Sequence, residues 1–150
     1  MDKTIIVNQL LRAKKQGFHA VVPDIIAYDA LEIMAEKNVG ALLVVENGKL
    51  MGVFSERDYA RKVILKGKAS KSTTVRELMS SPPIVISPEA SLQNCMVLLT
   101  QKHIRHLPVV DNGVLIGVVS IGDVVNAIIS EQNVVIEQLK DYIGGNEYKT

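Results

Sequence analysis

Two serine–aspartate pairs have the residue types and spacing to bind a ligand. They lie in Gly-Val-Phe-Ser-Glu-Arg-Asp at 52–58 and Gly-Val-Val-Ser-Ile-Gly-Asp at 117–123, each at a predicted junction from strand to helix. One interpretation is structural, because the serine can cap the helix and the aspartate can complete a capping box. The other is functional. A helix start attracts phosphate, and a nearby carboxylate can accept hydrogen bonds from both hydroxyls of a ribose.

These two motifs belong to a longer internal repeat. A shift of 65 positions brings residues 39–58 over 104–123 without a gap, and ten of the twenty pairs are identical. Average residue usage would give about one match by chance. Duplication of one structural unit is therefore the sensible explanation, and it makes the repeat the basis for any prediction of the fold.

Each copy has the same predicted order of elements. A short apolar strand at 20–22 or 84–86 precedes a proline and a helix, whose apolar residues recur at helical spacing. Two further strands follow, at 41–45 and 50–54 in the first copy and at 106–110 and 114–119 in the second. An Asn-Gly pair separates them, which favours a tight hairpin turn. A second helix then begins at the serine, giving a βαββα unit.

The segments outside the repeated units differ in character. Residues 66–74 are rich in Lys, Ser and Gly, and predict an exposed linker. After the second unit, an apolar stripe continues at helical spacing as far as Gly144-Gly145, which predicts a last helix longer than its counterpart. We therefore expect a first repeat with an N-terminal helix at 1–65, a linker at 66–75, a second repeat at 76–143 and a tail at 144–150.

Composition narrows the classes of partner and chemistry. The net charge of +1 predicts no broad basic face for nucleic acid, and no apolar run reaches the roughly 20 residues that span a bilayer. The first residues do not resemble a secretory signal, so we expect a cytoplasmic protein. The single Cys95 lies among apolar residues and is predicted to be part of the core. Three scattered histidines and this cysteine predict no metal site and no enzyme.

With these motifs in view, the chain from about residue 7 to 129 resembles a tandem pair of cystathionine-beta-synthase (CBS) domains, often called a Bateman module. The resemblance rests on Leu-Pro-Val-Val-Asp at 107–111, its looser copy Leu-Leu-Val-Val-Glu at 42–46, and the two Gly-Val-x-Ser-x-x-Asp stretches. It implies an α+β fold, sandwich-like, in which two βαββα repeats are related by pseudo-twofold symmetry. It also implies two clefts that bind AMP, ADP, ATP or NAD, each built from both repeats.

The resemblance assigns these residues to each cleft. The first cleft is expected to join Val53, Ser55, Arg57 and Asp58 to Ile84, Arg105 and His106. The second is expected to join Val118, Ser120 and Asp123 to Lys14, His19, Gly40 and Ala41.

The two clefts differ in charge. Arg105 and His106 stand where the other copy has Gly40 and Ala41, so the first cleft is predicted to be the tighter phosphate site. The second lacks the basic pair, and its repeat has Leu43 in place of the motif's proline, which leaves its occupancy open. Arg61 and Lys62 are expected to be rotated away from Asp58 on the following helix, and His103 to be an exposed helix residue.

The sequence therefore predicts a non-catalytic regulatory module that senses an adenosine-containing small molecule and acts on an unidentified client protein. No catalytic cofactor is expected. The long last helix and the outer helices are predicted to form a homodimer across a twofold axis. The alternative is a protein-interaction scaffold that has kept the CBS fold with empty clefts.

Overall fold

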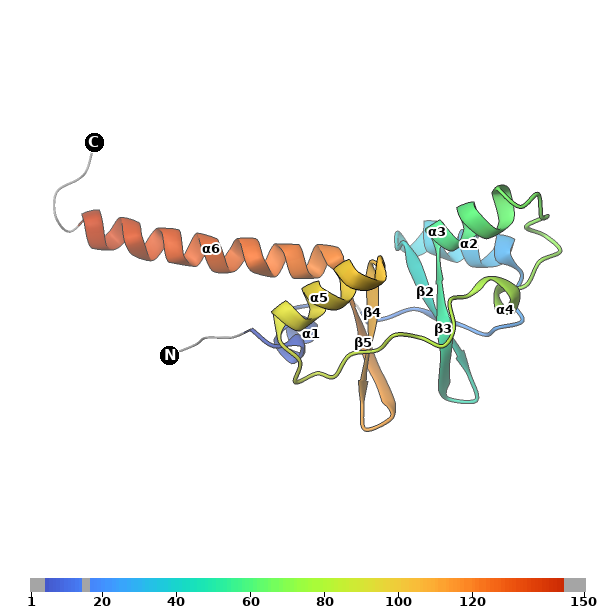
Figure 1. Cartoon of the computed structure of the whole chain (residues 1–150), viewed down its shortest axis with the longest axis horizontal. Coiled ribbons are helices and arrows are strands. Elements are labelled where there is room, and N and C mark those ends of the chain that lie inside the picture. Colours follow the sequence, from blue (N-terminus) through green and yellow to red (C-terminus); the bar gives the residue numbers. More distant parts are fainter. Residues whose placement is uncertain (1–4, 15–16, 145–150) are drawn as a thin grey trace.

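The computed structural model describes residues 5–14 and 17–144, which form two similar halves and one long projecting helix (Figure 1). The first half contains β1 (Ala20–Val21), α2 (Ala27–Lys37), β2 (Ala41–Glu46), β3 (Lys49–Ser55), α3 (Glu56–Tyr59) and a π-helical turn, η1 (Ala60–Ile64). The second half contains α5 (Leu92–Lys102), β4 (His106–Asp111), β5 (Val114–Ser120) and α6 (Ile121–Gly144). Two short helices, α1 (Val7–Ala13) and α4 (Val75–Leu78), precede the halves in the chain. The fold is α+β, as predicted.

Both hairpins form as the repeat predicts. β2 pairs antiparallel with β3, and β4 pairs antiparallel with β5, each with a register shift at the equivalent position. Asn47 and Gly48 have φ values of 52° and 77°, and Asn112 and Gly113 have values of 49° and 81°. Asparagine and glycine tolerate this left-handed backbone better than other residues. The Asn-Gly pairs therefore fix both turns.

The predicted first strand of the second copy is reduced to a single bridge. β1 pairs in parallel with β2, and Leu43 N donates to His19 O at 3.0 Å. In the second half only Ile86 bridges Val109, so the strand predicted at 84–86 was wrong in extent. The physical reason is Pro108, which stands at the position of Leu43 and has no N–H to donate. The same proline that marks the family motif thus shortens the sheet.

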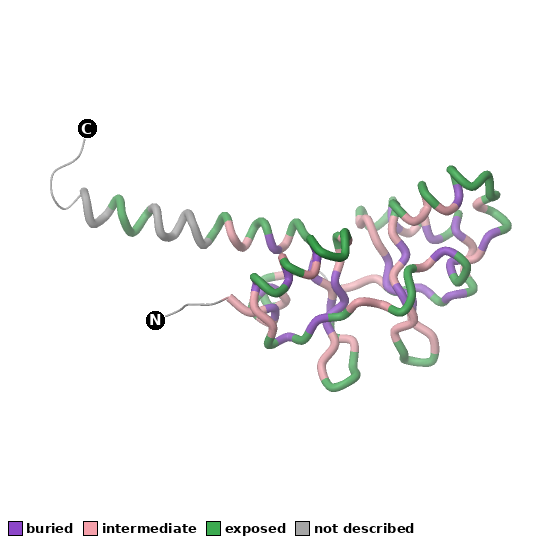
Figure 2. The backbone as a smooth tube through the Cα atoms, viewed as in Figure 1, coloured by how far each residue is buried: buried purple, intermediate pink, exposed green. Residues whose placement is uncertain are grey.

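Each half has its own apolar core, and the two short helices are exchanged between them. Val7 and Leu10 of α1 are buried with the second-half core, whereas Val75 and Leu78 of α4 are buried with the first-half core. Buried segments consequently run through both halves (Figure 2). This exchange was not predicted, since the N-terminal helix was expected to belong to the first repeat and no helix was expected at the end of the linker.

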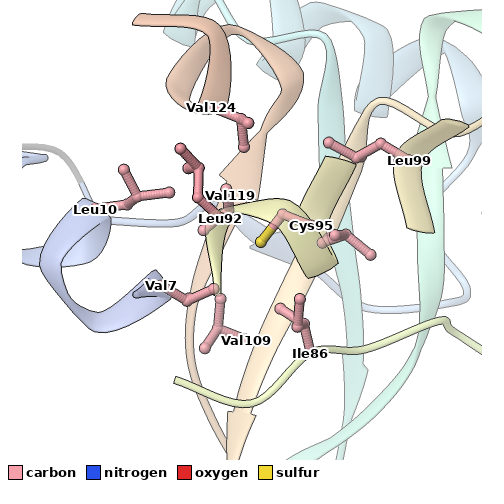
Figure 3. Packing of buried hydrophobic residues seen from close by; sticks show 10 residues of the cluster. Val7, Leu10, Ile86, Leu92, Cys95, Leu99, Val109, Val119 and Val124 are labelled. Carbon is pink, nitrogen blue, oxygen red and sulfur yellow. The ribbon is translucent and has the colours of Figure 1, made fainter. Parts of the chain in front are cut away.

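The second-half core encloses the single cysteine. Cys95 is completely buried, and Figure 3 shows its sulfur among Leu92, Val109 and Val119. Burial raises the pKa of the Cys95 thiol, which favours the neutral form. The prediction that Cys95 belongs to the core is confirmed.

The linker and the last helix also follow the sequence, with two exceptions. Residues 66–72 are largely exposed, but Thr73 and Val75 are buried; the Thr73 hydroxyl donates to Ala69 O at 2.8 Å, and Val75 begins α4. α6 extends to Gly144, far beyond the counterpart that ends at Ile64, and projects from the body (Figure 1). Val124 anchors the start of α6 in the core, while Val125 and Ile129 remain exposed.

Candidate functional site

The two serine–aspartate pairs form capping boxes at the starts of α3 and α6. Ser55 N donates to Asp58 Oδ2 at 2.9 Å, and Asp58 N donates to Ser55 Oγ at 3.1 Å. Ser120 and Asp123 repeat both bonds at the same distances. The structural interpretation of the motifs is therefore correct. It leaves the second carboxylate oxygen of each aspartate available for other contacts.

A cavity of about 660 Å³ lies at the seam between the halves, beside Asp58. Its walls include every residue predicted for the first cleft, namely Val53, Ser55, Arg57, Asp58, Ile84, Arg105 and His106. Arg57 reaches across the seam, where its Nη1 donates to His103 O at 2.8 Å. Gly40, predicted for the second cleft, lines this cavity as well. The volume lies within the range of pockets that enclose small ligands and cofactors.

Several cavity residues were missed by the sequence prediction. Arg61 and Lys62 both line the cavity, and Lys62 Nζ lies 3.3 Å from Asp58 Oδ1. The expectation that they are rotated away from Asp58 was wrong, because residues three and four apart share one face of a helix. That spacing could have identified them.

His103 and Ser80 also join the cavity wall. His103 is exposed, as predicted, but it is the C-cap of α5, with φ of 53°, and not a residue within the helix. Ser80 follows α4, and its Oγ donates to Asp58 Oδ1 at 3.2 Å. No sequence pattern marks Ser80, because its position depends on how α4 packs against the first half.

The cavity is strongly electropositive. Five side chains with a fixed positive charge line it against two carboxylates; the charged residues are Arg57, Arg61, Lys62, Lys102, Arg105, Glu56 and Asp58. His106 is partly buried, and burial, together with the charges of Lys14 and Arg105, lowers its pKa despite the opposing charge of Asp123. His106 is therefore a neutral hydrogen-bonding group near pH 7. Such a wall suits an anion with several negative oxygens.

At the position predicted for the second cleft, a lysine of the protein contacts the motif. Lys14 Nζ lies 2.9 Å from Asp123 Oδ2 and donates to Val118 O at 2.9 Å. Burial opposes ionisation of Asp123, but the Ser120 N–H and the ammonium of Lys14 hold its pKa below the usual value. Lys14, Val118, Ser120 and Asp123 are thus brought together.

The other residues predicted for the second cleft have different surroundings. The carbonyl of His19 accepts from Leu43 N, and Ala41 begins β2 opposite Ser55. A Cβ placed on Gly40 would lie 3.7 Å from His106 Cε1. Gly40 therefore lies close to the boundary between the two clefts.

Among the described residues, no group of three or more His, Cys, Asp or Glu side chains could hold a metal ion. No described helix is both long and apolar enough to cross a membrane.

The repeated fold and the paired motifs define a class of protein, and comparison identifies the family. The family model described as "CBS domain" matches residues 15–65 and 75–130, which are the two halves of the structure. The chain belongs to this family and contains a pair of CBS domains.

Individual relatives extend this result. The chain is 44% identical over 123 residues to the mitochondrial CBS domain-containing protein CBSX3 of Arabidopsis thaliana, a match that covers 79% of this chain and 60% of CBSX3. It is 38% identical over 103 residues to CBS domain-containing protein YhcV of Bacillus subtilis, covering 69% and 73% of the two chains. The chain thus spans less than two thirds of CBSX3.

Solved structures agree on the fold. A CBS-domain protein of Burkholderia ambifaria with a suggested role in signal transduction superposes with a TM-score of 0.81 at 43% identity, covering 85% of this chain and 96% of that one. A hexameric CBS-CP12 protein from bloom-forming cyanobacteria gives a TM-score of 0.71 at 27% identity, covering 81% and 69%. The prediction of a CBS pair is confirmed.

Proposed function

We propose that this chain is a non-catalytic regulatory module that senses an adenine nucleotide (AMP, ADP, ATP or NAD) in its first cleft. The observation that carries the proposal is the cavity of about 660 Å³, where a carboxylate at a helix start faces a wall rich in arginine and lysine. A nucleotide has the complementary groups, since a ribose offers two hydroxyl donors and the phosphates offer anionic acceptors. One similar solved structure, described with a suggested role in signal transduction, supports the regulatory role.

The proposed orientation of the ligand follows from the chemistry of the walls. The ribose hydroxyls donate to Asp58, replacing contacts that Ser80 and Lys62 now make. The phosphates extend toward Arg105, which is exposed, and His106, which can donate a hydrogen bond. The base lies against the apolar side chains of Val53 and Ile84. Lys62 is 42% exposed, and to reach a phosphate its ammonium gives up the bond to Leu78 O at 2.8 Å as well as the contact with Asp58.

Calorimetry tests the proposal directly. AMP, ADP, ATP and NAD are each titrated into the chain, and at least one should bind and raise the melting temperature by mass action. Replacing Asp58 with Ala should weaken that ligand about 10- to 100-fold, because charge-assisted hydrogen bonds are lost. Asp29→Ala is the matched control, since Asp29 is an exposed carboxylate in the first turn of α2. It should leave affinity unchanged.

The opposite results have a clear meaning. If none of the four nucleotides binds at millimolar concentration, the first cleft is not a nucleotide site. The interaction-scaffold alternative would then hold, supported by the fact that Asp58 and Asp123 already have partners within the protein. Hydrolysis of a nucleotide above background by the purified chain would contradict a non-catalytic role.

We propose a homodimer formed through α6 and the outer helices, which presents a ligand-dependent surface to a client protein. The hexameric CBS-CP12 protein shows that a related pair of repeats can assemble, although into a larger particle. A cytoplasmic location remains a proposal. One relative, CBSX3, is described as mitochondrial.

A further inference from the structure

The side chain of Lys14 contacts the motif of the predicted second cleft from a segment outside the second repeat. The ammonium contacts Asp123 Oδ2 and Val118 O, both at 2.9 Å, and the two charged side chains are only 25% and 23% exposed. Lys14 follows directly after α1. The contact therefore joins a segment near the start of the chain to the motif that ends β5.

The segment after α4 is the counterpart of the segment after α1 that contains Lys14. α1 and α4 have corresponding positions, because a Cβ on Gly117 would meet the side chain of Leu11 and one on Gly52 would meet Met79. Beyond these helices the two segments differ. Ser80 contacts the first motif through a backbone bridge to Val53 and a neutral hydroxyl on Asp58. In the second half, a positive charge holds the equivalent carbonyl and carboxylate.

The two lysine–aspartate pairs also differ in how easily they separate. Lys62 lies four residues after Asp58 on the same helix, at 3.3 Å, and is 42% exposed. Each lysine also donates to a carbonyl, Lys62 to Leu78 O at 2.8 Å and Lys14 to Val118 O at 2.9 Å, so the pairs differ in exposure and in the distance to the carboxylate. A closer ion pair that is less exposed to solvent costs more to separate than a longer, more solvated one. A ligand therefore displaces Lys62 more readily than Lys14.

A ligand gains little in return at the second cleft. Gly40 and Ala41 take the places that Arg105 and His106 occupy at the first cleft, so no equivalent basic pair is present to bind phosphate. A ribose that uses both carboxylate oxygens of Asp123 would have to compete with Lys14 for Oδ2, the oxygen that also accepts from Ser120 N, without this compensation. The ammonium of Lys14 could attract a phosphate, but it lies against Asp123, where the ribose would bind.

We propose that Lys14 is the residue that decides how many nucleotides the chain binds, because it occupies the ribose position of the second cleft. The native chain then binds one nucleotide, in the first cleft, and the second cleft becomes a site when the ammonium is removed. This inference rests on the proposed function, since it assumes that Asp58 and Asp123 receive ribose.

Calorimetric titration with AMP tests the inference. The native chain should bind one AMP, and Lys14→Met, which keeps the aliphatic stem, should bind two. The added site should disappear in the double variant Lys14→Met/Asp123→Ala. Arg12→Met is the matched control, because Arg12 is an exposed cation on α1, and it should bind one AMP like the native chain.

A second measurement needs no variant. Backbone amide signals of Val53 and Ser55 should move when AMP saturates the native chain, while those of Val118 and Ser120 should stay in place. Movement of both pairs with two sites, or a Lys14→Met chain that still binds one AMP, overturns the inference. So does a second site in the native chain that Lys14→Met weakens, since Lys14 would then contact the ligand.

The outcomes separate this inference from the proposed function. If the native chain binds no AMP but Lys14→Met binds one in an Asp123-dependent manner, the role of Lys14 holds and the first-cleft proposal fails for AMP. If the native chain binds one AMP through Asp58 and Lys14→Met adds none, the proposed function holds and this inference fails. Absence of AMP binding by both proteins overturns the role of Lys14.

Discussion

His106 is the residue at which the charges of both clefts meet. It lines the first cavity, yet its pKa is affected by Lys14 and Asp123 of the second cleft as well as by Arg105. Burial is the largest cause of the lowered pKa, so the folded chain favours the neutral imidazole. The protonation of His106, which lines the first cleft, is therefore linked to the charges of Lys14 and Asp123 at the second.

The lowered pKa predicts a loss of stability in mild acid. As pH falls below the ordinary histidine value of 6.5, the unfolded chain takes up a proton more readily at this residue than the folded chain does. Stability therefore decreases as the pH falls toward the folded pKa, by up to about 1.4 kcal/mol for each pH unit in that interval. Melting temperatures measured between about pH 7.5 and 5.5 should show the decrease, and His106→Asn should reduce it.

His103→Asn is the control for this prediction. His103 is exposed, and its φ of 53° suits asparagine, so the variant should keep the native pH dependence. Asp123 does not confuse the result, because its pKa lies below the ordinary value of 3.8 and its contribution is lost only in stronger acid. Equal decreases in the native chain and in His106→Asn would mean that another group causes the acid sensitivity.

At the scale of elements, two equivalent glycines have unequal neighbours. A Cβ on Gly52 would lie 2.7 Å from the carbonyl oxygen of Ser80, whereas one on Gly117 would lie 2.8 Å from Leu11 Cδ2. Backbone cannot move away as a side chain can, so Gly52→Ala should destabilise the chain by about 1–3 kcal/mol and Gly117→Ala by less. Urea unfolding of both variants measures the difference. Equal losses would contradict the close approach of Ser80 to β3.

The hairpins and the motif helices could be predicted because their signals are local. The Asn-Gly turns, the apolar strands and the Ser-x-x-Asp caps each depend on residues that are adjacent in the chain. Because each pattern occurs in both repeats, each copy supports the prediction made for the other. The walls of the first cleft followed from the family resemblance, which supplied the crossing between repeats that no local pattern contains.

The other features depend on contacts between distant segments. Pro108 belongs to the family motif, but its effect on the strand at 84–86 appears only once Ile86 lies beside Val109. Lys14 was predicted to contact ligand, and nothing in its neighbours along the chain indicates that Asp123 would be its partner. Exchange of α1 and α4 between the cores is equally non-local. Arg61 and Lys62 are different, because helical spacing was sufficient to place them.

At the scale of the whole molecule, the exchanged helices join the halves mechanically. α1 contributes to the second-half core and then leads to Lys14 in the second cleft, while α4 contributes to the first-half core and leads to Ser80 in the first. Arg57 adds a direct bond across the seam to the carbonyl of His103. A ligand at the seam that displaces Ser80 or Arg57 therefore changes contacts made by both halves. The ligand can then favour one arrangement of the halves over another, which a conformational response requires.

The projecting part of α6 leads to the last prediction, which concerns assembly. Its described side chains include exposed apolar residues, with Ile129 49% and Leu139 55% accessible, and the helix projects from the body of the molecule (Figure 1). A helix with an unburied apolar stripe is stabilised by packing against another copy.

Light scattering should therefore give a multiple of 16.4 kDa for the native chain. Leu139→Glu should weaken the association at least about tenfold. Gln138→Glu, which adds the same charge at an exposed neighbouring position, should leave it intact. A native particle of 16.4 kDa would exclude the dimer, and equal dissociation by both variants would show that charge on α6, and not its apolar stripe, controls assembly.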